Sequence, residues 1–137
     1  MELVRIAREQ WDVLAVLDSR EQCQVLDFLG RPGLAHPAAR RQLLVFLRVV
    51  LPVEGPPRNN AELCKPLGDG VFELRRQPKG PKLRVLFFYD DGYRIVCTNA
   101  FAKTKKRPRQ EIELAKRLRK RYFEAKSHEM LQILEET

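Results

Sequence analysis

Five basic residues crowd the segment that follows residue 102, and no other stretch of the chain is as well suited to chemistry. They are Lys103, Lys105, Lys106, Arg107 and Arg109. Like charges at this spacing repel one another unless an anion lies among them. A lysine among other cations has a lowered pKa, and an arginine presents a planar fork to phosphate oxygens. The segment therefore predicts an anion-binding site.

Two further arginines are expected to lie together because of the strands that carry them. Alternating apolar residues predict a strand from Val71 to Gln77. Leu83 to Tyr89 and Tyr93 to Thr98 are rich in β-branched and aromatic residues, and an Asp-Asp-Gly turn separates them. The three segments predict an antiparallel meander. Arg75 ends its first strand and Arg84 begins its second, so both are expected at the same end of the sheet.

Residue types exclude several common catalytic sites. His36 and His128 are the only histidines, and neither is spaced from carboxylates as metal ligands are. Glycine-rich phosphate loops are absent, and a serine or cysteine nucleophile would lack a histidine base. A cationic site can instead cleave RNA, through attack of the 2'-hydroxyl on the adjacent phosphorus. The general base stays open between Lys103 and Lys105, with Glu73 as a weaker candidate.

The charge of the chain is concentrated in its last third. The net charge over 137 residues is +8, and residues 103–126 hold 11 basic and 3 acidic residues. Clustered basic residues favour a nucleic-acid partner, although an acidic protein partner would fit the same composition. The individual charges of residues 116–121 are more simply explained as a solvated helix face.

Length and composition predict one domain, residues 1–137, with a modest core. The N-terminus does not resemble a signal peptide and no stretch is long enough to span a bilayer, so we expect a soluble cytoplasmic protein. Cys23, Cys64 and Cys97 have no metal-like spacing and are expected to be buried thiols.

The remaining elements are expected to support the meander. A strand is predicted from Trp11 to Leu17, after a short lead-in, and a helix from Arg20 to Leu29, capped by Asp18 or Ser19 and stopped by Gly30. A second helix is predicted from Pro37 to about Leu51, with Pro52 ending it. A long basic amphipathic helix follows Pro108. The acidic tail from Ser127 could extend that helix or dock on the core.

The order of these elements and three motifs resemble the RelE/HigB toxin superfamily, and most closely its phage-derived HigB-like branch. The motifs are D-G-V-F-E-L-R at residues 69–75, R-V-L-F-F at 84–88, and F-A-K-T-K-K-R-P at 101–108 followed by E-I-E-L-A at 111–115. The resemblance covers roughly residues 63–125. It implies an α+β, RelE-like compact fold: an N-terminal strand and two helices, then a three-stranded antiparallel meander and a C-terminal helix.

The resemblance also implies a function. Such proteins are toxins of type II toxin-antitoxin pairs that cleave messenger RNA in the ribosomal A site without metal or cofactor. A cognate antitoxin neutralises them, and the toxin-antitoxin complex is expected to be oligomeric. Carried over by motif, the catalytic candidates are Arg75, Arg84, Lys103 and Lys105. The candidates for RNA binding are Arg76, Lys82, Phe101, Lys106, Arg107 and Arg109.

Two other functions stay open. A ParE-like toxin of the same superfamily would inhibit gyrase and cut no RNA. A non-catalytic, basic nucleic-acid-binding protein would bind RNA with an affinity that falls steeply with salt, and would form no product.

Overall fold

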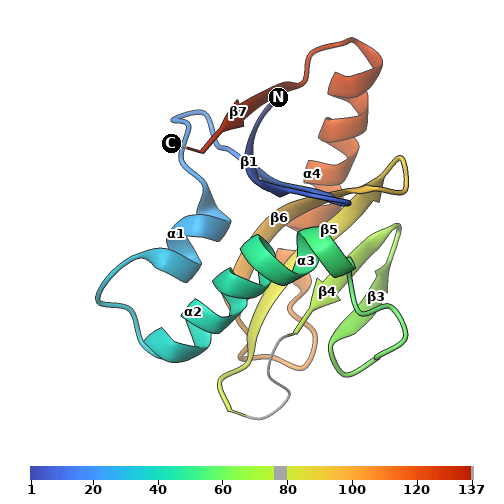
Figure 1. The fold of residues 1–137 in the computed structure, drawn as a ribbon. Helices are drawn as coiled ribbons and strands as arrows, with labels where there is room; N and C mark the ends of the chain where they lie inside the picture. Colours follow the sequence, from blue (N-terminus) through green and yellow to red (C-terminus); the bar gives the residue numbers. More distant parts are fainter. Residues whose placement is uncertain (76–79, 137) are drawn as a thin grey trace.

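The strands form a single mixed sheet in the computed structural model, which describes residues 1–75 and 80–136 (Figure 1). Its seven strands lie in the order β3-β4-β5-β6-β2-β1-β7. They are β1 (Glu2–Arg8), β2 (Asp12–Val16), β3 (Cys64–Gly68), β4 (Val71–Leu74), β5 (Leu83–Asp90), β6 (Arg94–Ala102) and β7 (Gln132–Glu135). The pairs β2–β6 and β1–β7 are parallel, and the other pairs are antiparallel.

Helices cover both faces of this sheet. One face packs against α1 (Gln24–Gly30) and against a continuous helix made of α2 (Pro37–Val45), η1 (Phe46–Val50) and α3 (Leu51–Glu54). The other face packs against α4 (Arg109–Ser127). Neighbouring strand residues therefore enter opposite cores: Val85 and Phe87 pack under the first set of helices, and Leu86 and Phe88 under α4.

The α+β class and the antiparallel pairing of β4, β5 and β6 are confirmed, but the sheet is larger than expected. The lead-in at residues 2–8 is a full strand, and the acidic tail forms β7 beside it. Both faces of β1 are covered, so its residues lack the apolar and polar alternation that marks a half-exposed strand. The β3 strand contains Pro66, which an edge strand tolerates because no neighbour needs its missing N–H.

The first helix begins later than predicted. Helix α1 begins after Cys23, and the Asp18 carboxylate instead accepts hydrogen bonds from the backbone N–H groups of Arg20 and Gln22, at 2.8 and 2.9 Å. These bonds close a local turn, which competes with a helix start for the same oxygen. The capping prediction for Asp18 or Ser19 was therefore wrong.

The prediction that Pro52 ends the second helix was also wrong. The wide turn η1 interrupts the α-helical hydrogen bonding, and Pro52 then lies in the first turn of α3, where a missing N–H costs little. The helix ends at Gly55, whose φ is +75°.

The three cysteines are buried and free, as predicted. The long helix after Pro108 is also confirmed, with Ile112, Ala115 and Tyr122 buried on its sheet-facing side. No helix within residues 1–75 and 80–136 is long and apolar enough to cross a membrane.

Candidate active site

The two arginines predicted to share one end of the sheet do so. Strands β4 and β5 pair Leu74 with Val85, and continuing this register by one residue places Arg75 beside Arg84. The next strand pairs Phe101 with Arg84, and the Lys103 N–H donates to the Lys82 carbonyl at 2.7 Å. The ends of three adjacent strands therefore bring Arg75, Arg84 and Lys103 together.

Glu73 is the acidic partner that these cations share. It is 1% exposed, and its Oε1 accepts a hydrogen bond from Arg75 Nε at 2.7 Å. Arg84 Nε lies 3.2 Å from the same oxygen, but its N–H is not aligned for a hydrogen bond, so we treat this contact as electrostatic. Glu73 thus fixes two guanidinium groups at one point.

Arg84 is unusually buried for an arginine and keeps an unsatisfied donor. Its side chain is 5% exposed, and Nη1 donates to the Leu83 carbonyl at 3.0 Å. Burial lowers the pKa of Arg84, and the nearby Arg75 lowers it further against the opposing effect of Glu73. A buried N–H without an acceptor is costly, so an anion that offered an oxygen here would be stabilised.

The charges of Glu73, Arg75 and Arg84 also act on Lys103. Burial lowers its pKa, Glu73 raises it, and the positive charges of Arg75, Arg84 and Lys65 lower it, so that the net shift is downward. We call these residues the cationic cluster: Lys65, Glu73, Arg75, Arg84 and Lys103. The cluster has one carboxylate and four cations, so its net charge is positive and favours binding of a phosphate.

Sequence reasoning missed Lys65 because it missed the strand that carries it. The β3 strand pairs Lys65 directly with Glu73. The segment Cys64–Gly68 contains a proline and a glycine and has no strand-like pattern. The sequence therefore offered no reason to place Lys65 beside Glu73.

The loop before α4 lies beside this cluster but is more open. Lys105, Lys106, Arg107 and Arg109 are all exposed. Three of these four, all but Lys106, line a shallow hollow together with Phe101 and Glu111. Lys82 is exposed as well, and Arg76 lies outside the described residues. The loop residues are therefore accessible to a large ligand such as RNA.

Phe101 occupies a mostly structural position. It is 8% exposed and packs with Leu86, Ile112 and Ala115 beneath α4. For Phe101 to contact an RNA base, as predicted, the base would have to enter the hollow that Phe101 lines.

The first turn of α4 is fixed to the sheet beside the cluster. Asn99 Nδ2 donates to the Glu111 carboxylate at 2.7 Å and to its backbone carbonyl at 3.2 Å. Gln24 forms two hydrogen bonds with the backbone of Ala100, at 2.6 and 2.7 Å, on the part of β6 that β2 does not reach. The end of β6, which leads into Lys103, is thus held on one face by α4 and along its open edge by Gln24.

A second charged network lies at the other end of β5 and was not expected from the sequence. Tyr122 donates a hydrogen bond to the buried Asp90 carboxylate at 2.6 Å, and Lys126 donates to its other oxygen at 2.7 Å. Arg94 reaches both Tyr122 and the buried Asp12. This network attaches the second half of α4 to the sheet.

Within the described part of the chain, no group of three or more histidine, cysteine, aspartate or glutamate side chains is placed to hold a metal ion.

Together, the mixed sheet and its basic strand ends describe a small α+β protein with a cationic site. A model of the phage-derived Gp49-like protein family (DUF891) matches residues 34–120, and the chain belongs to this family. The family is one of toxin-like, HigB-like proteins associated with toxin-antitoxin systems. Searches of curated proteins and of solved structures gave no match.

Proposed function

We propose that the protein is the toxin of a type II toxin-antitoxin pair and that it cleaves messenger RNA on the ribosome. Membership of a toxin-like family supports the first part. The observation that carries the second is the convergence of Arg75, Arg84 and Lys103 on the buried carboxylate of Glu73.

The cationic cluster has the groups that 2'-hydroxyl attack requires. The developing phosphorane gains negative charge, which fixed guanidinium groups stabilise without having to reorganise. Arg84 supplies a buried, unsatisfied Nε–H for a non-bridging oxygen, and Arg75 supplies a second guanidinium beside it. Glu73 holds both in place before the substrate arrives.

Lys103 is the best placed group for proton transfer. Its lowered pKa makes its neutral form more accessible than that of an ordinary lysine, and its half-buried position leaves it within reach of a substrate. Lys105 is farther along the same loop and is exposed, so it is the second choice. Glu73 is the third choice, because its carboxylate already interacts with Arg75 and Arg84.

The exposed loop would hold the rest of the RNA. Lys82, Lys106, Arg107 and Arg109 offer cations for neighbouring phosphates, which adds affinity without reading sequence. A cognate antitoxin that neutralises the toxin would cover this basic surface or compete with the ribosome for it.

The test is cleavage of a ribosome-bound messenger by purified protein, with 5'-ends mapped. Arg84→Lys keeps the charge but loses the fork, and we expect it to lower the cleavage rate roughly 100-fold. Lys103→Ala should lower it by about the same factor or more. Lys120→Ala removes one exposed cation from the far side of α4 and should leave the rate unchanged.

Other results would redirect the assignment. Full cleavage by both cluster variants would mean that the site lies elsewhere. If expression arrested growth and triggered DNA damage signalling with the messengers intact, gyrase inhibition would be the better explanation. RNA binding that weakens with salt, with no product, would indicate a non-catalytic binding protein.

A further inference from the structure

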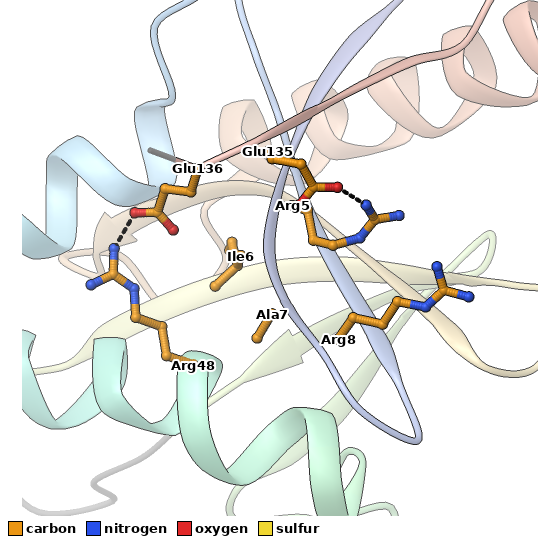
Figure 2. A pocket seen from close by; sticks show the side chains of 7 residues that line it. All are labelled: Arg5, Ile6, Ala7, Arg8, Arg48, Glu135 and Glu136. Carbon is orange, nitrogen blue, oxygen red and sulfur yellow. Dashed lines mark hydrogen bonds and ion pairs between the residues drawn. The ribbon is translucent and has the colours of Figure 1, made fainter.

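A recess rich in arginine lies far from the cationic cluster, at the edge of the sheet where β7 pairs with β1. Its lining consists of Arg5, Ile6, Ala7, Arg8, Arg48, Glu135 and Glu136 (Figure 2). In Figure 2, Glu135 forms an ion pair with Arg5 and Glu136 forms one with Arg48. The C-terminal tail thus places two carboxylates among three arginines.

The tail is held weakly. Strand β7 pairs with β1 over only four residues, and every residue of β7 is exposed or half-buried. The Glu135 side chain is 67% exposed, so its ion pair is screened by water and contributes little to stability. The apolar contacts of the tail come from Leu131 and Ile133, which are only partly buried at the edge of the core under α4. A short, exposed edge strand of this kind can be displaced.

Strand β1 continues beyond the end of β7. Their register pairs Glu2 with Gln132 and Arg5 with Glu135, which leaves Ile6, Ala7 and Arg8 without a strand on that side in the described structure. Arg8 is exposed, and its side chain has no hydrogen bond or ion pair with any residue that the structure describes. A longer strand in the same register would bring a residue beside Arg8.

An open strand edge favours a peptide over a nucleic acid. The backbone of β1 offers N–H and C=O groups that another strand can pair with, and RNA has no equivalent ladder. The arginines favour acidic side chains at the positions where the tail already has Glu135 and Glu136. The apolar residues Ile6 and Ala7 lie among the same arginines.

We propose that the outer edge of β1, with Arg5, Arg8 and Arg48, is a docking site for an acidic extended segment of a partner protein, and that β7 occupies this site until the partner displaces it. The partner strand runs parallel to β1 and extends past Arg5 to place a carboxylate beside Arg8. This site is independent of the cationic cluster and of any reaction there.

The test uses the full chain and two labelled peptides. The shorter peptide has the sequence of residues 130–136, and the longer one adds Glu-Glu. The register of β1 shifts between Arg5 and Ala7, so two consecutive glutamates place a carboxylate beside Arg8 whichever face of the strand it occupies. The double change Glu135→Gln and Glu136→Gln weakens the competing tail. We expect this variant to bind the longer peptide at least about threefold more tightly than the unchanged chain does, because two screened ion pairs no longer hold the tail in the site.

Arg8→Gln separates this proposal from general charge attraction. Added to the tail variant, this change should weaken the binding of the longer peptide about threefold or more and leave the binding of the shorter peptide unchanged. Lys120→Gln, on α4, should alter neither. Replacing the glutamates of the longer peptide with glutamine should also weaken its binding.

Several outcomes would overturn the proposal. They are equal binding of acidic and neutral peptides, absence of binding to the tail variant, and no effect of Arg8→Gln on the longer peptide. A single-stranded RNA that displaced the peptide in an Arg8-dependent way would assign the recess to nucleic acid. Dimerisation of the tail variant that excluded the peptide would assign it to a second copy of the chain.

Discussion

Glu73 shows how one buried carboxylate can organise a basic site. Arg84 has been taken out of water and has Arg75 next to it, an arrangement that is unfavourable unless an anion compensates. Glu73 provides this compensation through a single oxygen. The residue that looked like a weak candidate for the general base is better explained as the group that positions both arginines.

We therefore expect Glu73→Gln to destabilise the fold and to lower cleavage. Glutamine keeps an acceptor oxygen but removes the charge, so Arg84 stays buried without its counterion. The expected loss is about 2 kcal/mol in the free energy of unfolding, measured by urea denaturation. Glu113→Gln is the control, because Glu113 is exposed and, among the residues that the structure describes, forms an ion pair only with Lys116, at 3.7 Å. This change should cost less than about 0.5 kcal/mol. Equal effects of the two changes would contradict the role given to Glu73.

At the level of elements, the junction after α3 depends on a glycine that no other residue can replace without strain. Gly55 combines φ +75° with ψ −179°, a region open almost only to glycine. A Cβ at this position would come within 2.6 Å of the Trp11 ring. The close approach lets the helix end fold over Trp11, whose backbone N–H donates to the Pro52 carbonyl at 2.8 Å.

Gly55→Ala should accordingly be far more damaging than Gly92→Ala. Both glycines have φ +75°, but a Cβ on Gly92 meets nothing within 4 Å. We expect about 1 kcal/mol of destabilisation for Gly92→Ala and roughly 3 kcal/mol or more for Gly55→Ala, from thermal or urea unfolding. Similar values would mean that the Trp11 ring moves aside without cost.

Over the whole molecule, α4 joins the two ends of the sheet. Its first half packs Ile112 and Ala115 over Val71 and Leu86, close to the cationic cluster. Its second half is attached to Asp90 at the opposite end, through Tyr122 and Lys126. Burial raises the pKa of Tyr122, the hydrogen bond to Asp90 raises it further, and the value reaches about 12, so this phenol remains a proton donor at neutral pH.

Asp90 should make the stability of the protein depend on pH. Burial by itself raises the pKa of Asp90, but the hydrogen bonds from Lys126 and Tyr122 and the charge of Arg94 lower it below its ordinary value of 3.8. A lowered carboxylate pKa stabilises the fold above the unfolded-state value, and the contribution disappears as the pH falls through the folded-state value. The stability that Asp90 contributes should therefore begin to fall at about pH 4 and keep falling at lower pH.

Asp90→Asn tests this contribution. At pH 7 we expect it to lower the free energy of unfolding by about 2 kcal/mol, and the difference from the unchanged chain should shrink as the pH falls below about 4. Asp91→Asn is the matched control, since Asp91 is 61% exposed and contacts only Lys126 in the network. A difference that stayed constant from pH 7 to pH 3 would show that the charge of Asp90 does not matter.

The sequence by itself determined the local features of the fold and part of the site. Periodicity identified the strands of the meander and helix α4, and antiparallel pairing was enough to bring Arg75 and Arg84 to one end of the sheet. The basic loop after residue 102 was visible as composition alone. These features depend on residues that are close in the chain, so a single sequence carries them.

Only the tertiary structure decided the rest. Strand β7 is defined by its pairing with β1 at the other end of the chain. Strand β3 pairs with the neighbouring β4, but its proline and glycine hide it from local patterns, and Lys65 reaches Glu73 only because β3 adds to β4. Likewise Arg5, Asp12, Arg94 and Asp90 form one network although Arg5 and Arg94 are 89 positions apart in the chain. Long-range pairing and the burial of charge depend on the packing of whole elements, which no local pattern encodes.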